Sequence, residues 1–127
     1  MELNELTYKI RGAFFEVYNQ LGPGLLESVY EMALMKEFEL LGIKAKSQVA
    51  LQVTYKGEYL ELGFRIDILV ESKVIIEIKS VKELEDVHKK QLLTYLKLSE
   101  IQVGFLINFN TAFLKDKESI IRIINGY

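Results

Sequence analysis

The fold is decided by residues 64–79, which read FRIDILVESKVIIEIK. Apolar residues occupy the even positions on both sides of the polar segment Glu71-Ser72-Lys73, and such alternation is typical of strands with one buried face. The pattern therefore predicts a hairpin that turns at 71–73. Its expected cross-strand pairs are Val70 with Val74, Ile68 with Ile76, and Ile66 with Ile78.

This register also determines the opposite face of the hairpin. It places Asp67 across from Glu77, and Arg65 across from Lys79. Only the apolar positions were used to set the register, so the meeting of two acids with a lysine is a consequence of the pattern.

The alternation continues upstream, from residue 49 to residue 62, around a two-residue turn at Lys56-Gly57. A single long hairpin pairs apolar residues with apolar residues throughout. Its expected pairs are Val53 with Leu60, Leu51 with Leu62, and Val49 with Phe64.

Helical periodicity flanks this β-rich centre. Apolar residues recur at steps of three and four over 4–21, with Asn4 as the expected cap, and again over 25–41, where Gly42 ends the helix. The segment Gly22-Pro23-Gly24 separates these two helices.

A third helix is expected over 82–98, followed by a buried strand over 103–109. A strand, a helix and a strand in one sheet imply a right-handed crossover and a parallel pair. The tail 118–125 suits a short helix or an edge strand, and its isoleucines favour the strand. We therefore predict an α/β sandwich on a mixed sheet, in which an antiparallel meander is joined by one parallel strand and flanked by helices.

Length and composition limit the function classes. The chain has 127 residues, a formal net charge of -2, one His and no Cys. This indicates one domain over 1–127 and excludes polybasic nucleic-acid binding, thiol catalysis and cysteine-ligated zinc. The N-terminus does not resemble a signal peptide and the apolar runs are too short to span a membrane, so we expect a cytoplasmic protein. Half of the residues are hydrophobic, which favours self-association.

The strongest candidate for chemistry is the sheet face that carries Asp67, Glu77 and Lys79. Cross-strand Cβ atoms lie about 5 Å apart, so both carboxylates could hold one hard cation such as Mg²⁺, with the Ile78 carbonyl as a further ligand. The alternative is a solvated sheet face on which these residues and Arg65 form salt bridges. Two opposed carboxylates without a cation are unfavourable, which supports the metal.

An ordered set of segments resembles a known family. Gly24-Leu25-Leu26-Glu27-Ser28-Val29-Tyr30 matches the signature of the GxxExxY protein family, and Asp67 followed by Glu77-Ile78-Lys79 resembles the PD-(D/E)XK nuclease superfamily. Further segments resemble that family in the same order: Gly22-Pro23-Gly24, Gly63-Phe64-Arg65-Ile66-Asp67, Glu77-Ile78-Lys79-Ser80, Gln91-Leu92-Leu93-Thr94-Tyr95-Leu96 and Leu106-Ile107-Asn108-Phe109-Asn110. The proline that the superfamily places before its aspartate is Ile66 here.

The resemblance implies a restriction-endonuclease-like fold and a role for each matching residue. It implies Asp67 and Glu77 as metal ligands, Lys79 as the catalytic lysine, Glu27 as a further acid at the metal, and Gln91 with Tyr95 as helix partners of the site. The implied activity is Mg²⁺-dependent hydrolysis of DNA, rather than RNA, with Mn²⁺ as a substitute. We expect a homodimer.

Several of these residues have structural alternatives. At the third helical position after Gly24, Glu27 could instead cap its own helix. Core packing suits Tyr30 at least as well as a hydroxyl contact to the site, and Tyr95 could lie at the edge of the core. Four lysines of the third helix could contact phosphates or could face only water: Lys82, Lys89, Lys90 and Lys97. For His88 we expect only a solvent-facing position on this helix.

Two other functions remain open from the sequence. The nuclease fold could serve as a catalytically silent module that binds nucleic acid or protein, as the small size favours. A structural protein with a salt-bridged sheet face is the third alternative.

Overall fold

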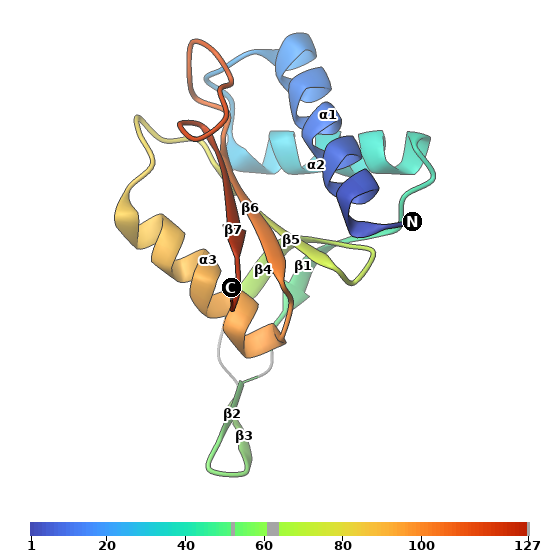
Figure 1. The fold of residues 1–127 in the computed structure, drawn as a ribbon. Helices are drawn as coiled ribbons and strands as arrows, with labels where there is room; N and C mark the ends of the chain where they lie inside the picture. Colours follow the sequence, from blue (N-terminus) through green and yellow to red (C-terminus); the bar gives the residue numbers. More distant parts are fainter. Residues whose placement is uncertain (52, 61–63, 127) are drawn as a thin grey trace.

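A computed structural model describes residues 1–51, 53–60 and 64–126 (Figure 1). Within these residues, three helices and seven strands follow one another. They are α1 (Leu3–Leu21), α2 (Glu27–Leu40), β1 (Ala45–Ala50), β2 (Val53–Tyr55), β3 (Glu58–Leu60), β4 (Arg65–Val70), β5 (Val74–Lys79), α3 (Asp86–Ser99), β6 (Val103–Asn108) and β7 (Ile120–Ile124). No helix in the described part of the chain is long and apolar enough to cross a membrane.

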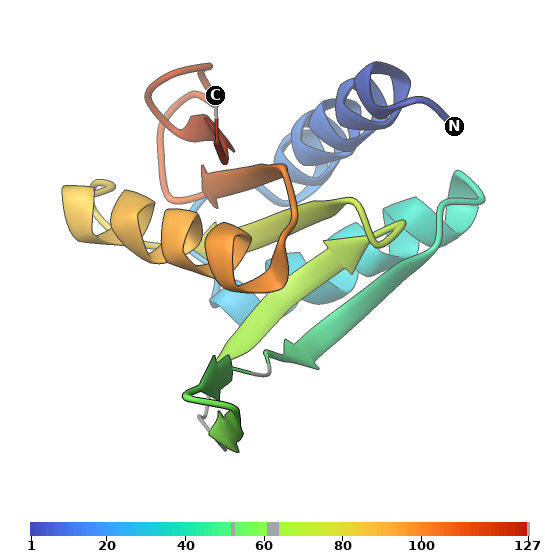
Figure 2. The same ribbon diagram turned by 60° about the horizontal axis from the view of Figure 1, so that its bottom comes forward.

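The main sheet has five strands in the order β1-β4-β5-β6-β7. β5 and β6 are parallel, while the other neighbouring strands are antiparallel. α1 and α2 cover one face and α3 covers the other (Figures 1 and 2). This confirms the mixed α/β sandwich with one parallel pair, and the tail forms the edge strand β7.

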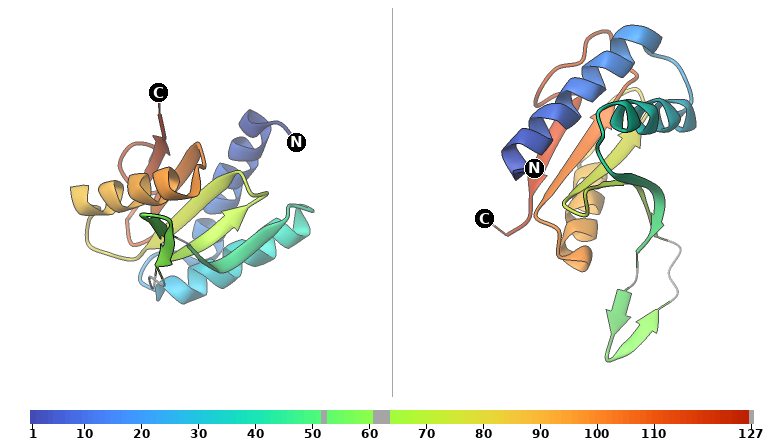
Figure 3. Two further views of the ribbon diagram at one scale, coloured as in Figure 1. Left: turned by 90° about the horizontal axis from the view of Figure 1, so that it is seen from below. Right: turned by 90° about the vertical axis from the view of Figure 1, so that its right-hand side faces the viewer.

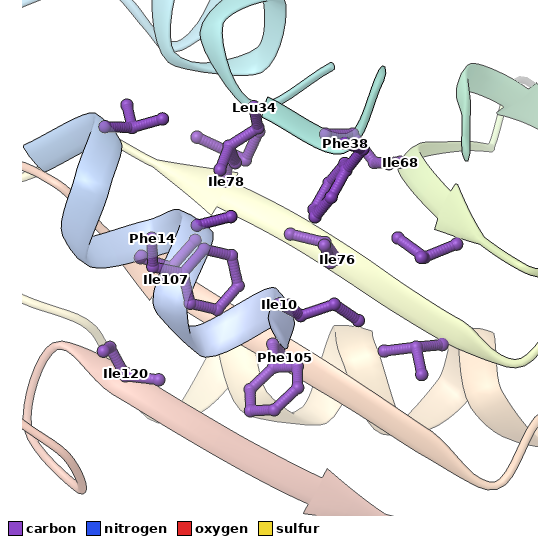
Figure 4. Close-up of a cluster of buried hydrophobic side chains, with 14 of the residues drawn as sticks. Ile10, Phe14, Leu34, Phe38, Ile68, Ile76, Ile78, Phe105, Ile107 and Ile120 are labelled. Atoms are coloured by element: carbon purple, nitrogen blue, oxygen red, sulfur yellow. The ribbon is translucent and has the colours of Figure 1, made fainter. Parts of the chain in front are cut away.

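Two apolar clusters hold these layers together. The larger one joins α1 and α2 to the even-numbered residues of β5, among them Ile76 and Ile78 (Figure 4). The smaller one packs α3 on Ile75 and Leu106. α3 approaches β6 closely, because a Cβ at Gly104 would lie only 2.9 Å from Leu92 Cδ1. Ile66 belongs to the smaller cluster, which corrects its expected place on the face of Ile68.

The helices occur where periodicity predicted them, but their starts differ. α1 is capped at Glu2, without a side-chain bond, and not at Asn4. α2 begins at Glu27 with Leu26 as its N-cap, so the expected cap at Gly24 is wrong. Its predicted end is confirmed, because Gly42 follows Leu41 with a φ of 70°.

α3 begins at Asp86, four residues later than expected. Glu85 and His88 form a capping box, in which the Glu85 amide donates to His88 Nδ1 at 2.9 Å. The preceding loop is held by the buried Asn108, whose Oδ1 accepts from the Val81 amide and whose Nδ2 donates to the Val81 carbonyl. The bonds of Asn108 hold residues of the predicted helix start, including Lys82, in a loop outside α3. The bond from the Glu85 amide gives His88 a capping role.

The hairpin over 49–64 also needs a correction. Val53 pairs with Leu60 as predicted, but in a separate two-stranded ribbon, β2–β3. In the main sheet Val49 pairs with Ile66 and not with Phe64. The expected pair of Leu51 with Leu62 lies outside the described residues. The register is therefore offset by two residues between the ribbon and the sheet, and a two-residue shift keeps the alternation of apolar positions in phase.

Candidate functional site

Asp67 and Glu77 meet where β4 and β5 part. The pairs Ile68–Ile76 and Val70–Val74 confirm the predicted register next to the turn. The described ladder ends at Ile68–Ile76, so the expected pairing of Ile66 with Ile78 does not form. Beyond the end of the ladder, the Asp67 amide donates to Glu77 Oε2 at 2.8 Å, and the Ile78 amide donates to Asp67 Oδ2 at 2.8 Å. The two carboxylates therefore replace ladder bonds in this part of the hairpin, and each retains a second oxygen.

Burial raises the pKa of Glu77 to about 8, with further contributions from the charges of Asp67 and Glu31. Glu77 is only 5% exposed. Burial also raises the pKa of Asp67, against the opposing effects of the Ile78 amide and Lys79. Burial and, after it, the neighbouring acids disfavour the charged form of both carboxyl groups, and a bound cation would offset this penalty.

Lys79 is the cation beside this pair. It ends β5, opposite Asn108 of β6, and its carbonyl accepts from the Phe109 amide at 3.1 Å. Its charge lowers the pKa of both Asp67 and Glu77. The structure thus brings the three motif residues together, and Ile78 joins them through its amide while its side chain is buried in the larger cluster.

Glu27 links the start of α2 to the end of β5. Glu27 Oε2 accepts from the Ser80 amide at 3.2 Å, and Ser80 Oγ donates to the Leu25 carbonyl at 2.7 Å. Glu27 is the first residue of α2, so the capping alternative at the third position is wrong. Its charge contributes to the raised pKa of Asp67. Within the described residues, however, no three Asp, Glu or His side chains lie close enough to hold one metal ion.

Glu31 and Gln48 border the pair and were missed from the sequence. Gln48 Nε2 donates to Glu31 Oε1 at 2.7 Å and lies 3.5 Å from Asp67 Oδ1. Burial raises the pKa of Glu31, and the charge of Asp67 adds to this rise. The spacing of Glu27 and Glu31 is a usable signal, because residues four apart share a helix face.

α3 contributes Tyr95 to the same region. Burial and the charges of Glu77 and Asp67 raise the pKa of Tyr95, while Gln91 lowers it by hydrogen bonding. Tyr95 is buried and Gln91 is exposed. Of the two predicted helix partners, Tyr95 is thus the one enclosed beside the carboxylates.

Tyr30 lies in the core. Its ring stacks on Phe109 at 4.3 Å, and its hydroxyl donates to the Gly22 carbonyl at 2.6 Å and accepts from the Leu25 amide at 3.1 Å. Tyr30 therefore packs in the core and holds the loop before Glu27. This agrees with the alternative in which Tyr30 has a packing role and does not contact the site. Arg65 is exposed and donates to the Gln48 carbonyl at 3.2 Å.

The predicted phosphate contacts do not form one group. Lys82 is exposed in the loop before α3, and Lys90 is exposed on the helix. Lys89 lies 3.9 Å from Asp86 and lines a separate cavity together with Arg11 and Arg122 of α1 and β7.

The paired carboxylates, the lysine two residues after Glu77 and the supporting helix are the arrangement expected from the sequence motif. A model of the PD-(D/E)XK nuclease superfamily matches residues 4–123, at a level that does not distinguish the GxxExxY family. No curated protein and no solved structure shows a significant match to the chain. The matched region covers nearly every residue, and the chain belongs to the PD-(D/E)XK nuclease superfamily.

Proposed function

We propose that this protein is a Mg²⁺-dependent nuclease that hydrolyses phosphodiester bonds in DNA. The observation that carries the proposal is the buried pair of Asp67 and Glu77, each bonded to the backbone of the other strand, with Lys79 beside it. A solvated, salt-bridged sheet face would leave both carboxylates ionised at low pKa values. The raised pKa values of this pair oppose that alternative.

The side chains fit a hard divalent cation. Asp67 and Glu77 supply oxygen only, and each uses one oxygen for a backbone amide. The second oxygen of Asp67 accepts only a long bond of 3.5 Å from Gln48, so a cation could take its place beside the second oxygen of Glu77. Mg²⁺ suits such a site because it keeps several waters and needs few carboxylates. Mn²⁺ should substitute. When bound, the cation polarises a phosphoryl oxygen and lowers the pKa of a coordinated water.

The other catalytic roles, which are charge neutralisation and orientation of water and phosphate, belong to side chains of the protein. Lys79 is placed to neutralise charge that develops on the phosphoryl oxygens and to orient the attacking water. Glu27, tied to the end of β5 through Ser80, adds a carboxylate that can accept a hydrogen bond from a water of the metal. Tyr95 excludes bulk water from one side, and Gln91 beside it can donate to a phosphate.

A cleavage assay tests the proposal. Purified protein with Mg²⁺ or Mn²⁺ is expected to cut at least one of linear, nicked, branched or single-stranded DNA. Lys79→Ala and Asp67→Asn should abolish the cut while far-UV circular dichroism stays unchanged. Lys46→Ala serves as the matched control, because Lys46 is an exposed strand residue paired with Leu69 away from the site.

The result also decides between nuclease and silent module. Absence of cleavage on all of these substrates and on RNA, with folded protein and saturating metal, would refute the enzyme. Cleavage of RNA but not DNA would correct the substrate only.

The cytoplasmic location stays a prediction.

We also propose a homodimer, for which α2 supplies the supporting observation. The helix exposes Met32 and Val29, and its N-cap Leu26 is exposed as well; Met32 and Leu26 are each 74% accessible. A helix that is apolar on two sides favours burial on both. Light scattering should show a dimer, and Met32→Glu should convert it to a monomer without unfolding it.

A further inference from the structure

The β2–β3 ribbon, residues 53–60, stands apart from the main sheet. It projects away from the body of the molecule, beyond the side covered by α3 (Figures 1 and 3). A two-residue turn closes it, with positive φ at Lys56 (50°) and Gly57 (81°). A two-stranded ribbon gains little stability from its own contacts, so a bound partner would add to what holds it in shape. We call residues 53–60 the arm.

Two tyrosines form the exposed faces of the arm. Tyr55 is 59% exposed and Tyr59 is 75% exposed. Tyr55 pairs with Glu58, and Tyr59 pairs with Thr54, so the two rings lie on opposite faces of the ribbon. The charges of Lys56 and Glu58 cancel within the arm. Its surface therefore offers aromatic rings and no excess of positive charge.

Phe64, which precedes β4 in the described chain, lies against α3 beside the carboxylate site. Phe64 leads from the arm into β4, and its ring lies 5.7 Å from the ring of Tyr95 on α3. Tyr95 is in turn close enough to Glu77 and Asp67 to be influenced by their charges. Asp67 itself is the third residue of β4. A substrate strand that leaves the site past Phe64 would run toward the arm, which precedes Phe64 in the chain.

We propose that the arm binds unpaired nucleotides of the substrate by stacking their bases on Tyr55 and Tyr59. This inference rests on the proposed nuclease function and narrows its substrate to nucleic acid with a single-stranded segment next to the cleaved bond. Every base has a π-face, so aromatic stacking captures single strands without sequence preference. A ribbon also fits the major groove of duplex DNA, but an arm without net positive charge has little to hold the phosphates there.

A binding assay in a non-cleaving background tests the arm. In Asp67→Asn protein, fluorescence anisotropy compares a single-stranded oligonucleotide, the blunt duplex of the same sequence, and that duplex with a single-stranded overhang. Y55A/Y59A should weaken binding of the single strand and the overhang by about tenfold, and that of the blunt duplex by less than about twofold. The dependence of affinity on salt should stay the same, because no phosphate contact is lost.

Two further variants make the comparison specific. Tyr8→Ala is the matched control, since Tyr8 is 76% exposed but lies on α1, which covers the face of the sheet opposite α3 (Figure 1). It should bind like the parent. Tyr59→Phe keeps the ring and should retain affinity. The melting temperature of each variant confirms that it is folded.

Several results would overturn the proposal. An equal loss on all three nucleic acids would indicate a groove or backbone contact, and no loss on any would leave the arm outside the interface. A changed oligomeric state with unchanged binding would make the arm a protein contact. If the wild-type protein cuts nothing, the proposed nuclease fails, but the contrast between single strand and duplex still decides the role of the arm.

Discussion

The carboxylates of Asp67 and Glu77 each accept a hydrogen bond from a backbone amide of the opposite strand, across β4 and β5. Glu77 Oε2 accepts from the Asp67 amide, and Asp67 Oδ2 accepts from the Ile78 amide, both at 2.8 Å. In an ordinary ladder these backbone amides would donate to carbonyls of the neighbouring strand. Here they donate to two acidic side chains instead. This arrangement holds two carboxylates side by side in a partly buried place, which is unfavourable for stability and is expected at a functional site.

Metal binding should stabilise the protein through this pair. Because a ligand that binds only the folded state raises stability by mass action, saturating Mn²⁺ at about 100 times its Kd adds roughly 2.7 kcal/mol. We expect Asp67→Asn and Glu77→Gln to lose this gain in thermal denaturation. Glu83→Gln, in the exposed loop before α3, should keep it. A gain that survives in the Asp67 and Glu77 variants would place the metal elsewhere.

The stability of the metal-free protein should fall as the pH rises. The pKa of Glu77 is raised from its usual 4.5 to about 8, so between these values the folded protein binds a proton that the unfolded chain releases. The stability from this group is full below about pH 4.5 and is lost as the pH passes 8. The raised pKa of Asp67 acts in the same direction.

Glu77→Gln isolates this effect, because an amide can still accept from the Asp67 backbone but cannot ionise. Urea denaturation from pH 5 to pH 8 should show a smaller decline for this variant than for the wild type, and Glu77→Gln should be the more stable protein at pH 8. Parallel profiles for the two proteins would contradict the raised pKa.

Gln48 should act as a positioning residue. Its amide joins Glu31 to the Asp67 side chain, and loss of such an outer contact typically costs 10–100-fold in metal affinity or activity. We expect Gln48→Ala to weaken Mn²⁺ binding in calorimetry by roughly tenfold and to lower kcat, with little change in KM. Gln20→Ala, which removes only an exposed bond to Glu16 on α1, should change neither.

The Tyr30 hydroxyl should stabilise the loop before α2. It bonds the Gly22 carbonyl and the Leu25 amide, so Tyr30→Phe leaves two backbone groups without this partner. We expect a loss of about 1–3 kcal/mol in urea denaturation, with the Phe109 stacking retained. Tyr8→Phe, at an exposed position, should be neutral. An unchanged free energy of unfolding for Tyr30→Phe would show that water replaces both bonds.

Much of the fold could be predicted because the sheet alternates so regularly. The even positions of β5 fixed the pairing of Ile68 with Ile76, and β6 followed as its parallel neighbour. The register of β1 could not be predicted in this way. A shift by two residues leaves every side chain on its face, so the apolar pattern does not discriminate between Phe64 and Ile66 as the partner of Val49.

The same shift explains why Gln48 was missed. The predicted register places it across from Arg65, whereas in the sheet its side chain reaches Asp67. Glu31 could have been found from its spacing to Glu27. The bonds from the Asp67 amide to Glu77 and from the Ile78 amide to Asp67 could not be predicted, because they depend on where the two strands separate and not on which residues face each other.

The most direct test of the central claim is a crystal grown with Mn²⁺ and measured at an anomalous wavelength. The account predicts one strong anomalous peak between the carboxylates of Asp67 and Glu77, within 2.0–2.6 Å of an oxygen of each, on the scale of metal–oxygen bonds. The absence of a peak there at saturating Mn²⁺, or a peak only at other acidic side chains, would contradict it.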